Sequence, residues 1–570
     1  MQTIPHQLES AFRAAISAAL QIDADPAIGV SQNEQFGDYQ CNAAMGLAKT
    51  VAEKTGKKQN PRAIAEQIIA KLDLGAMGET SIAGPGFINV RLSRPWLEQR
   101  LAEIAGDNRL GVEKPASPQT VVVDYSGPNV AKEMHVGHLR PTNIGDAIAR
   151  ILEFQGQHVI RQNHIGEWGM QFGLLVARLM ETGAAEQTSL ADMESFYKAA
   201  KTRYDEDPAF AAQARQTVLR LQNGEPHERN LWGKIIDHSR RHFQSLYDRM
   251  DVSMTRADER GESFYNPVLA DVITELQTAG VATESQGAIV VWVDGFEAPL
   301  IIRKSEGGYG YATTDLAAVR YRVKELHAQR IIYFTDSRQS QHFAQFFSAA
   351  RRAGWAAGVQ LDHVGFGTIL GPDGKPFKTK SGENVKLKDL LDEAEQRALR
   401  VVVEKNPELP EKQQHEIAHA VGVGAIKYFD LARDWVGNYV FDWDKMLALD
   451  GNTAPYLQYA HARICSIFRK AAGASTRGKI VLAEPAELSL AKHILRLGEI
   501  IEQVGRELKP HHLCGYLYEL ATRFSGFYEK CPVLQSDEPT RTSRLALCSL
   551  TARTLERSLD LLGIQHPEQM

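Results

Sequence analysis

Three consecutive valines in the segment VVVDYS, residues 121–126, constrain the fold of this chain more than any other feature of its sequence. A continuous β-branched run is typical of a strand that is buried on both faces, as the strands of parallel sheets are. A helical pattern follows around residues 145–154, Gly156 ends it, and HVIRQNHIG, residues 158–166, is a second strand candidate. A strand, a helix and a strand in this order predict a doubly wound parallel sheet, whose ligands lie at the carboxyl ends of the strands.

The same pattern extends over a long middle segment of the chain. Buried-strand patterns return in RIIYFTDS, residues 330–337, and in HVGFGTIL, residues 363–370. Before them, residues 185–250 are mostly helix-periodic, and residues 288–304 predict a β-hairpin. We therefore expect residues 113–445 to form an α/β domain, Rossmann-like in its parallel sheet, that carries insertions.

Two further domains are expected at the ends of the chain. Residues 1–112 alternate helical and short extended patterns, which predicts a small α+β domain. The segment GVEKPASPQT, residues 111–120, contains two prolines and several polar turn formers, so we interpret it as a linker. Residues 446–570 are helix-periodic nearly throughout and predict an all-helical domain.

Charge and composition exclude several classes of protein. The net charge of −5 argues against a protein that coats nucleic acid without specificity, although residues 445–570 carry 16 Lys and Arg against 13 Asp and Glu. No apolar run approaches the roughly 18 residues that a membrane span needs. The start of the chain lacks a basic segment, and Arg13 interrupts its apolar part, so no secretory signal is expected. Five cysteines without a CxxC pair predict a reduced, cytoplasmic location and no structural zinc.

The motif HVGH, residues 135–138, lies between the first predicted strand and the helix after it. Two histidines three residues apart, His135 and His138, could ligate a metal or simply lie on a helix surface. Their position favours a third interpretation, because a helix that begins beyond the carboxyl end of a buried strand is where nucleotide phosphates bind. Imidazoles there can donate hydrogen bonds to phosphate oxygens as charge develops in a transition state.

The residues around HVGH extend the pattern to SGPNVAKEMHVGHLRPTNIGDA. This segment resembles the class I aminoacyl-tRNA synthetases, and among them the arginyl-tRNA synthetases of the bacterial type, whose HIGH motif corresponds to HVGH. The resemblance covers essentially the whole chain and implies catalytic roles for Lys132, His135 and His138. It also implies ATP contacts for Pro128 and Gly137.

A second motif, GPDGKPFKTKSGENVKL at residues 371–387, is a basic loop that begins at a glycine. From the residues alone, a solvated turn with exposed lysines is the favoured interpretation. The resemblance instead implies the KMSKS loop, which closes over ATP and neutralises its triphosphate as pyrophosphate departs. Lys375 would then contact ATP, and Lys378 and Lys380 would be catalytic.

This loop departs from the general class I pattern. Thr379 stands where a second lysine is expected if Gly382 is aligned. In arginyl members the loop is commonly degenerate, and a lysine just ahead of HIGH, here Lys132, is thought to substitute. The resemblance therefore implies phosphate contacts for all three loop lysines, Lys375, Lys378 and Lys380.

A guanidinium substrate calls for planar carboxylate acceptors and an aromatic face. In GYGYATTDLAAVRYR, Tyr311 and Asp315 lie four residues apart at a strand-to-helix transition. On their own they predict a packing residue and a helix N-cap, respectively. The resemblance implies that both bind arginine, as does Glu262 in RGESFYN, and that Asn129 and Gln339 hold the amino-acid head group.

Two motifs of the first domain, FGDYQCN at residues 36–42 and GPGFIN at residues 84–89, match the N-terminal domain peculiar to arginyl-tRNA synthetases. Both could be glycine turns that pack a small domain, and for FGDYQCN we favour that interpretation. The resemblance implies that Phe87 and Asn89 recognise a base of the tRNA D-loop, for which stacking and an amide hydrogen bond are suitable chemistry. The helical C-terminal domain resembles an anticodon-binding domain, in which we assign no contacts.

The resemblance implies ATP-dependent ligation of L-arginine to arginine tRNA through an arginyl-adenylate, with ATP and Mg²⁺ as cofactors. We expect a monomer that has no metal-ligating residues and no membrane contact. Two alternatives stay open: an adenylate-forming ligase on the same fold that uses no tRNA, and a non-catalytic tRNA-binding paralogue. The two terminal domains argue against the first, and the intact HVGH motif with Lys132, Tyr311 and Asp315 argues against the second. A cysteinyl synthetase is disfavoured because the scattered cysteines cannot supply its zinc site.

Overall fold

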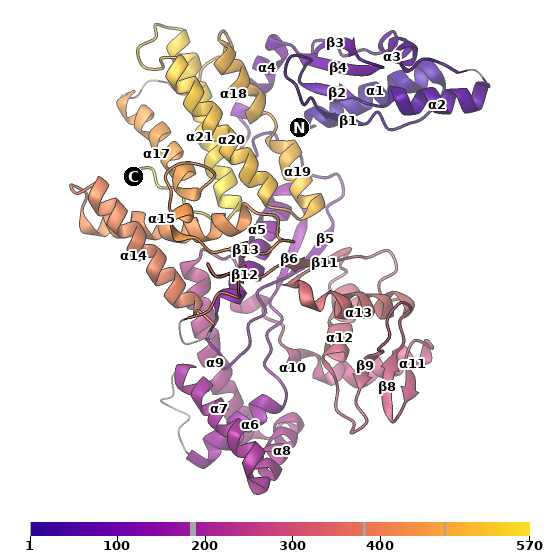
Figure 1. The fold of residues 1–570 in the computed structure, drawn as a ribbon, viewed down its shortest axis with the longest axis vertical. Coiled ribbons are helices and arrows are strands. Elements are labelled where there is room, and N and C mark those ends of the chain that lie inside the picture. The colour runs from indigo at the N-terminus through magenta and orange to yellow at the C-terminus, as the bar shows by residue number, and fades with distance from the viewer. Residues whose placement is uncertain (1, 57, 183–189, 380–383, 472, 474) are drawn as a thin grey trace.

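A computed structural model describes residues 2–56, 58–182, 190–379, 384–471, 473 and 475–570. A central parallel sheet lies between the two terminal regions and two lobes from the middle of the chain (Figure 1). The N-terminal region, in indigo, lies beside the helices of the C-terminal region at one end of the molecule, and two lobes from the middle of the chain extend at the other end. Among the described residues, no helix combines the length and the apolar character needed to cross a membrane.

The central sheet has the strand order β11-β10-β5-β6, and its strands run parallel. These strands are β5 (Thr120–Asp124), β6 (His158–Gln162), β10 (Arg330–Asp336) and β11 (Gln360–Phe366). Val121 and Val123 face a core that includes helix α5 (Leu139–Gln155). Val122 faces a second core, which includes α12 (Tyr311–Lys324) and α13 (Ser340–Arg352). Because the valines are buried on both faces, β5 lies inside the sheet, and the predicted doubly wound architecture is confirmed.

Helix α5 connects β5 to β6 and begins directly after the 3₁₀ turn η1 (Val136–His138). It ends at Gly156, whose φ of 102° lies in the left-handed region that glycine adopts without strain. Most of α5 is buried, because it packs against the sheet on one side and against helices of the C-terminal half on the other. The turn that precedes α5 therefore stands on a rigid support.

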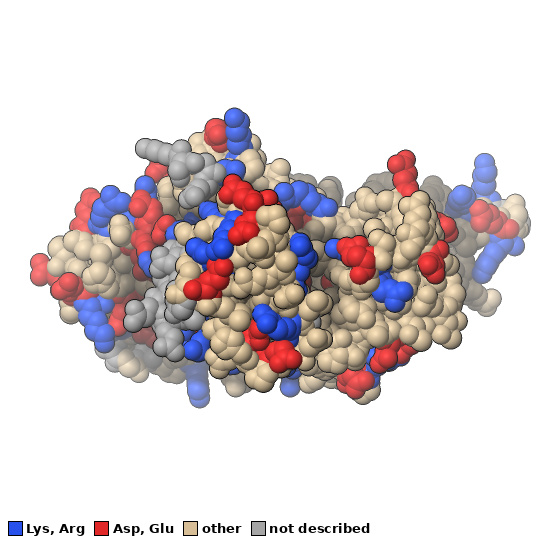
Figure 2. All heavy atoms as spheres, turned by 90° about the horizontal axis from the view of Figure 1, so that it is seen from below, with Lys and Arg blue, Asp and Glu red and all other residues tan. Residues whose placement is uncertain are grey.

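Two lobes are inserted between β6 and β10. The first lobe is helical and contains α6 (Met170–Thr182), α7 (Leu190–Glu206), α8 (Pro208–Asn223) and α9 (Pro226–Arg249). The second lobe contains α10 (Glu262–Tyr265), α11 (Leu269–Thr278), β7 (Thr283–Ser285), β8 (Ala288–Val291) and β9 (Leu300–Arg303). Strands β8 and β9 pair antiparallel, which confirms the predicted hairpin. Seen from below, the lobes stand on either side of a hollow, and charges of both signs are scattered over them (Figure 2).

The N-terminal region has an antiparallel sheet of order β1-β2-β4-β3 with helices packed on one face. Its elements are α1 (Ile4–Leu20), β1 (Ile28–Val30), β2 (Tyr39–Cys41), α2 (Ala44–Thr55), α3 (Pro61–Ile69), β3 (Gly78–Ala83), β4 (Phe87–Leu92) and α4 (Arg94–Ala105). In β4, Ile88 and Val90 are fully buried in the core shared with the helices. Phe87 and Asn89 alternate with them and lie on the opposite face of the sheet.

From Leu387 onward, the described part of the chain is helical with one exception, and the helical fold predicted for residues 446–570 is confirmed. Its helices are α14 (Leu387–Lys405), α15 (Glu411–Leu431), α16 (Trp443–Met446), α17 (Ala454–Lys470), α18 (Pro485–Ile494), α19 (Leu497–Glu507), α20 (His511–Lys530) and α21 (Thr540–Leu561). The exception is the short strand β13 (Tyr439–Val440), which pairs in parallel with β12 (Ile369–Leu370). A strand of two residues is too short to leave a periodic signal in the sequence.

The N-terminal and C-terminal regions are in direct contact. The hydroxyl of Tyr39 donates to Glu499 in α19 at 2.9 Å, and Lys492 in α18 pairs with Asp38 at 2.6 Å. Asp38 and Tyr39 both belong to FGDYQCN, which therefore joins two regions as well as forming a turn. The turn itself requires Gly37, because a Cβ atom there would lie 2.6 Å from the carbonyl oxygen of Val90.

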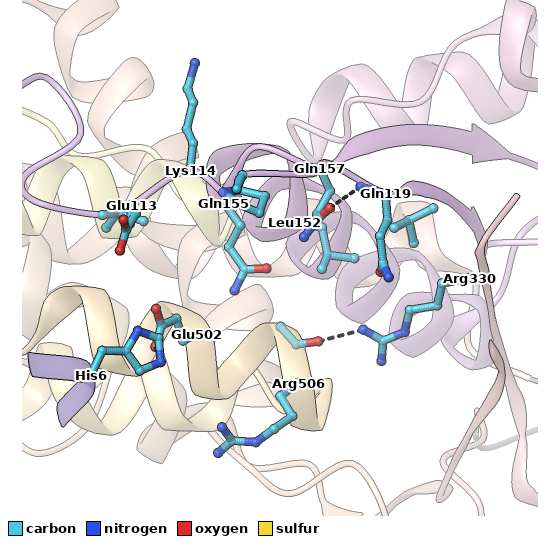
Figure 3. Close-up of a pocket in the computed structure, with 15 residues that line it drawn as sticks. His6, Glu113, Lys114, Gln119, Leu152, Gln155, Gln157, Arg330, Glu502 and Arg506 are labelled. Carbon is cyan, nitrogen blue, oxygen red and sulfur yellow. Dashed lines mark hydrogen bonds and ion pairs between the residues drawn. The ribbon is translucent and has the colours of Figure 1, made fainter. Parts of the chain in front are cut away.

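A cavity of about 390 Å³ lies where α1, the linker, the central sheet and α19 meet (Figure 3). His6 of α1 faces Glu502 of α19, with 3.5 Å between Nε2 and Oε2. Gln119 and Arg330 border the cavity at the amino ends of β5 and β10. Because ligands of a doubly wound sheet bind at the carboxyl ends of its strands, this cavity is not the candidate active site.

Candidate active site

The HVGH turn lies at the carboxyl end of β5, where the sequence predicts it. His135 Nδ1 accepts a hydrogen bond from the backbone N–H of Gly137 at 3.0 Å, and His138 Nδ1 accepts from the backbone N–H of His135 at 3.1 Å. Each neutral ring therefore carries its proton on Nε2. The ring centroids are 4.1 Å apart. Gly137 is required, because a Cβ atom there would lie 2.7 Å from Cε1 of His135.

The electrostatic setting keeps His138 uncharged. Burial, followed by the charge of His135 and to a smaller extent that of Lys132, lowers the pKa of His138 to about 3. At neutral pH its side chain is therefore a hydrogen-bond donor through Nε2 and not a cation. Lys132 is exposed and lies three residues ahead of the turn in the sequence.

The segment between β5 and HVGH is strained and tightly held. Ser126 and Ala131 have φ values of 73° and 63°, in the left-handed region that non-glycine residues rarely adopt. The hydroxyls of Ser126 and Tyr247 lie 2.7 Å apart, and the backbone N–H of Ala131 donates to Ser239 Oγ at 3.0 Å. Tyr247 and Ser239 belong to α9, so the first lobe fixes this segment. No sequence signal pointed to these contacts.

The basic loop returns to the HVGH turn at its C-terminal end. His135 and Lys386 pair as an isolated antiparallel bridge, and two backbone hydrogen bonds of 2.8 and 2.9 Å flank it. Glu133 forms an ion pair with Lys386. The C-terminal end of the loop is therefore attached to the turn by backbone hydrogen bonds and an ion pair.

The lysines of the loop lie ahead of this attachment. Lys375 and Lys378 are exposed, and Lys378 forms an isolated antiparallel bridge with Asn384, so the loop doubles back on itself. Lys380 and Gly382 lie outside the described residues. The attachment to HVGH favours a loop that serves the site over a free solvated turn.

Helix α12 begins at Tyr311, one turn earlier than an N-cap at Asp315 requires. Gly310 is the N-cap, and the hydroxyl of Thr313 donates to the carbonyl of Ile302 in β9, which fixes the start of the helix. The N-cap prediction for Asp315 is therefore wrong. The packing prediction for Tyr311 is also wrong, because this residue is 79% exposed.

The charge of Asp315 acts on the second acidic candidate, Glu262. Burial, together with the charge of Asp315, raises the pKa of Glu262 to about 7. The backbone N–H of Trp168 donates to Oε2 of Glu262 at 3.2 Å, which holds this carboxylate in place. Two carboxylates that repel each other in a partly buried site gain from a cation that binds near both.

The head-group candidates lie at the same edge of the sheet. Asn129 forms a parallel bridge with Gly166, which follows β6, and a Cβ atom at Gly166 would lie 2.6 Å from Oδ1 of Asn129. Pro128 is buried directly before it, and the exposed Gln339 is the N-cap of α13, just after β10. The candidates that follow β5 and β10 are thus gathered beyond the carboxyl ends of neighbouring strands.

Phe87 and Asn89 lie outside this site, in β4 of the N-terminal sheet, on the face opposite the helices. Asn89 is only 1% exposed, and Gln40 Nε2 donates to its Oδ1 at 2.7 Å. Nδ2 of Asn89 has no hydrogen-bond partner among the described residues, which is unusual for a buried amide. Sequence reasoning missed Gln40, although it stands in FGDYQCN, beside β4 in the sheet.

Three known protein families match successive segments of this chain. Residues 101–443 match the family described as tRNA synthetases class I (R), catalytic domain. Residues 6–92 match the Arginyl tRNA synthetase N terminal domain, and residues 457–570 match the DALR anticodon binding domain. The fold and the site therefore define the class I aminoacyl-tRNA synthetases as the class of this protein.

Individual relatives match over the full length. The chain is 50% identical over 590 residues to the arginine–tRNA ligase of Synechococcus elongatus, with 99% of both chains covered, and 48% identical over 578 residues to that of Laribacter hongkongensis, with 100% of both covered. The crystal structure of arginyl-tRNA synthetase from Plasmodium falciparum is similar, with a TM-score of 0.89 at 33% identity, and that from Thermus thermophilus has a TM-score of 0.84 at 26% identity. Both structural matches cover 100% of each chain. The chain belongs to the arginyl-tRNA synthetase family.

Proposed function

We propose that this chain ligates L-arginine to arginine tRNA, using ATP and passing through an arginyl-adenylate. The observation that carries the proposal is that the HVGH turn and the carboxylates Glu262 and Asp315 lie beyond the carboxyl edge of one parallel sheet. Phosphate-binding and guanidinium-binding groups thus share one site. The full-length similarity to arginine–tRNA ligases supports the proposal, and neither a tRNA-independent ligase nor a non-catalytic paralogue has such support.

In the first step, a carboxylate oxygen of arginine attacks the α-phosphorus of ATP in line, and the bond to the bridging oxygen of pyrophosphate breaks. The Nε2–H groups of His135 and His138 donate to phosphate oxygens as their charge increases. Pro128 and Gly137 lie against the nucleotide, and magnesium enters with ATP as part of that substrate. The groups that neutralise the departing pyrophosphate are Lys132, Lys375, Lys378 and Lys380.

Arginine is selected by charge and by shape. Glu262 and Asp315 accept hydrogen bonds from the guanidinium, Tyr311 contacts its face or edge, and Asn129 and Gln339 hold the head group. Citrulline has the shape without the charge, and lysine has the charge without the planar fork of donors. Either substrate would leave a carboxylate of the site unpaired, which is how a polar pocket rejects a near-isostere.

In the second step, the 2′-hydroxyl of the terminal adenosine attacks the carbonyl carbon of the adenylate, and AMP leaves. Phe87 and Asn89 recognise a D-loop base, and the helical domain binds the anticodon. We assign these tasks to residues 1–112 and 446–570, with catalysis in residues 113–445. We also propose that the protein is cytoplasmic and monomeric. Sedimentation equilibrium would measure its oligomeric state.

An arginylation time course with total tRNA tests the activity. We expect ATP-dependent incorporation of labelled arginine into acid-precipitable tRNA, and no incorporation of lysine or citrulline. Arginine-dependent exchange of pyrophosphate into ATP should occur only when tRNA is present, because the degenerate basic loop leaves the site incomplete without it. Exchange by the tRNA-free protein without any charging would favour the tRNA-independent ligase, and tRNA binding without exchange or charging would favour the paralogue.

A further inference from the structure

A histidine with no task in the steps above contacts the proposed guanidinium-binding carboxylate. Nε2 of His342, in the first turn of α13, lies 2.6 Å from Oδ2 of Asp315 in α12. The side chains are 32% and 24% exposed, so the pair lies at the edge of the site and not in the core. Within the described parts of the chain, no hydrogen bond reaches the other oxygen, Oδ1 of Asp315.

The imidazole of His342 is held by aromatic packing. Its ring centroid lies 5.2 Å from that of Phe346 and 6.0 Å from that of Phe343. Phe343 stacks on His363, with 4.2 Å between centroids and 2° between planes, and His363 Nε2 lies 2.8 Å from the hydroxyl of Thr335 in β10. The layer that holds His342 is therefore anchored in the strands of the central sheet.

This contact divides the two oxygens of Asp315 between two tasks. Oδ2 accepts from His342, which fixes the plane of the carboxylate, and Oδ1 remains for a ligand. A carboxylate without such a partner rotates in a broad χ2 well and loses that freedom when its ligand binds. A held carboxylate presents its oxygen in the geometry that a planar guanidinium needs.

Helix α13 connects this contact to the other end of the substrate. Gln339, which holds the head group in the proposed function, is the N-cap of α13, and His342 follows three residues later. The first turn of one helix therefore reaches the head group directly and the guanidinium through Asp315.

We propose that His342 is a positioning residue for arginine, which orients Asp315 and sets the distance between the head-group and guanidinium contacts. The inference rests on the proposed function of Asp315 and adds a residue to it. The ammonium ion of lysine has no fixed plane and gains less from an oriented carboxylate than a guanidinium does. His342 therefore contributes to selectivity for arginine as well as to its affinity.

Three variants test the positioning role. His342→Leu removes the donor and keeps an apolar side chain in the aromatic layer, whereas His342→Gln keeps an N–H near the position of Nε2. Phe347→Leu is the matched control, because Phe347 packs in the same layer against Phe343 and Phe346 and has no ring contact with His342 among the described residues. We expect His342→Leu to raise the KM for arginine about tenfold, with kcat and the KM values for ATP and tRNA within about twofold of the parent.

The two other variants distinguish positioning from packing. His342→Gln should recover most of the affinity for arginine, and Phe347→Leu should lower the melting temperature while leaving the arginine KM near the parental value. A purely structural His342 would instead make His342→Leu resemble Phe347→Leu. That result would overturn the proposal, as would a His342→Gln variant impaired as much as His342→Leu.

A second comparison separates this inference from the function on which it rests. If His342 acts through Asp315, adding His342→Leu to Asp315→Ala should change the arginine KM by less than about twofold. Independent, multiplicative effects would overturn the positioning role and leave Asp315 as an arginine-binding residue. A parental arginine KM in Asp315→Ala alone would overturn the assignment of Asp315 itself.

Discussion

Asp315 touches His342 on one side and, in the proposed function, the guanidinium of arginine on the other. Asp315→Asn keeps the shape and removes the charge, so a charge-assisted hydrogen bond worth about 1.5–3 kcal/mol becomes a neutral one. We expect the kcat/KM for arginine to fall roughly ten- to a hundredfold in an arginylation assay, with the KM for ATP nearly unchanged. A value within about twofold of the parent would contradict the assignment.

Glu262 gives the site a pH dependence. Burial raises its pKa to about 7, and only the ionised form attracts a guanidinium strongly. Because kcat/KM reports the ionisation of the free enzyme, we expect the value for arginine to fall as the pH decreases below about 7, by up to about tenfold per pH unit. Glu262→Gln should have a lower kcat/KM at about pH 8 and should lack this step. A parental profile that stays flat from about pH 6 to about pH 8 would refute the role.

The same shift affects folding with the opposite sign. The pKa of Glu262 in the folded protein, about 7, exceeds the ordinary value of 4.5, so the stability that its proton provides is present below pH 4.5 and is lost as the pH rises through 7. The ionised carboxylate therefore weakens the fold at about pH 8. Glu262→Gln should raise the free energy of unfolding there by roughly 1–3 kcal/mol and change it little near pH 4.5, as denaturant titrations at both pH values would measure.

The HVGH turn depends on the absence of a Cβ atom at Gly137. A Cβ atom at Gly137 would lie 2.7 Å from Cε1 of His135, so Gly137→Ala must displace the imidazole. Misplacing a reacting or donating group by about 1 Å costs on the order of a hundredfold in rate. We expect Gly137→Ala to lower the kcat for arginylation by about that factor, while the melting temperature changes little because Gly137 is exposed.

A glycine in open space provides the control for this substitution. Gly526 lies inside α20, and a Cβ atom there would meet nothing within 4 Å. Gly526→Ala should retain parental kcat and raise stability by roughly 0.5–1 kcal/mol through helix propensity. If Gly137→Ala were as active as Gly526→Ala, the turn would not depend on the position of His135.

Elements whose signal lies in their own residues could be predicted from the sequence. Strand β5 is an example, because burial on both faces leaves a continuous run of valines. Features fixed by distant partners could not be predicted. The left-handed backbone of Ser126 accompanies a contact with Tyr247 of α9, and the start of α12 at Tyr311 accompanies a hydrogen bond from Thr313 to a carbonyl of β9.

The same distinction, between local signals and distant partners, applies to the candidate site. Its motif residues could be identified by their resemblance to a known family, since HVGH and the acidic candidates stand in characteristic segments. The partners of these residues could not, because pairings such as His342 with Asp315 and Gln40 with Asn89 join different elements and leave no spacing in the sequence. Nor could spacing reveal that Asn89 is buried.

Recognition of the tRNA far from the catalytic sheet should be separable from catalysis. If Phe87 stacks on a D-loop base and Asn89 reads its edge, Phe87→Ala/Asn89→Ala should remove stacking worth about 1–3 kcal/mol together with a hydrogen bond. The loss should appear in the KM for tRNA or in the charging rate, while the parameters for ATP and arginine change much less. Packing residues would instead give a lower melting temperature with parental discrimination among tRNAs.

A tRNA altered at the recognised D-loop base is the control for this double variant. The parent should charge it poorly, because a contact to that base is lost. The double variant should be nearly indifferent to the alteration, because it has already lost the contact. Equal sensitivity of both proteins would rule out the recognition role.

The contacts between the N-terminal and C-terminal regions fix the distance between these two regions. Asp38 with Lys492 and Tyr39 with Glu499 hold the two proposed tRNA-reading ends against each other. If both regions bind tRNA as proposed, these contacts would fix the span between the D-loop contact and the anticodon contact. A tRNA lengthened by one base pair in its anticodon stem would keep every recognised base and still present them too far apart and rotated. We expect such a tRNA to bind one region at a time, so that two polar contacts between regions of the protein would discriminate against it by its dimensions.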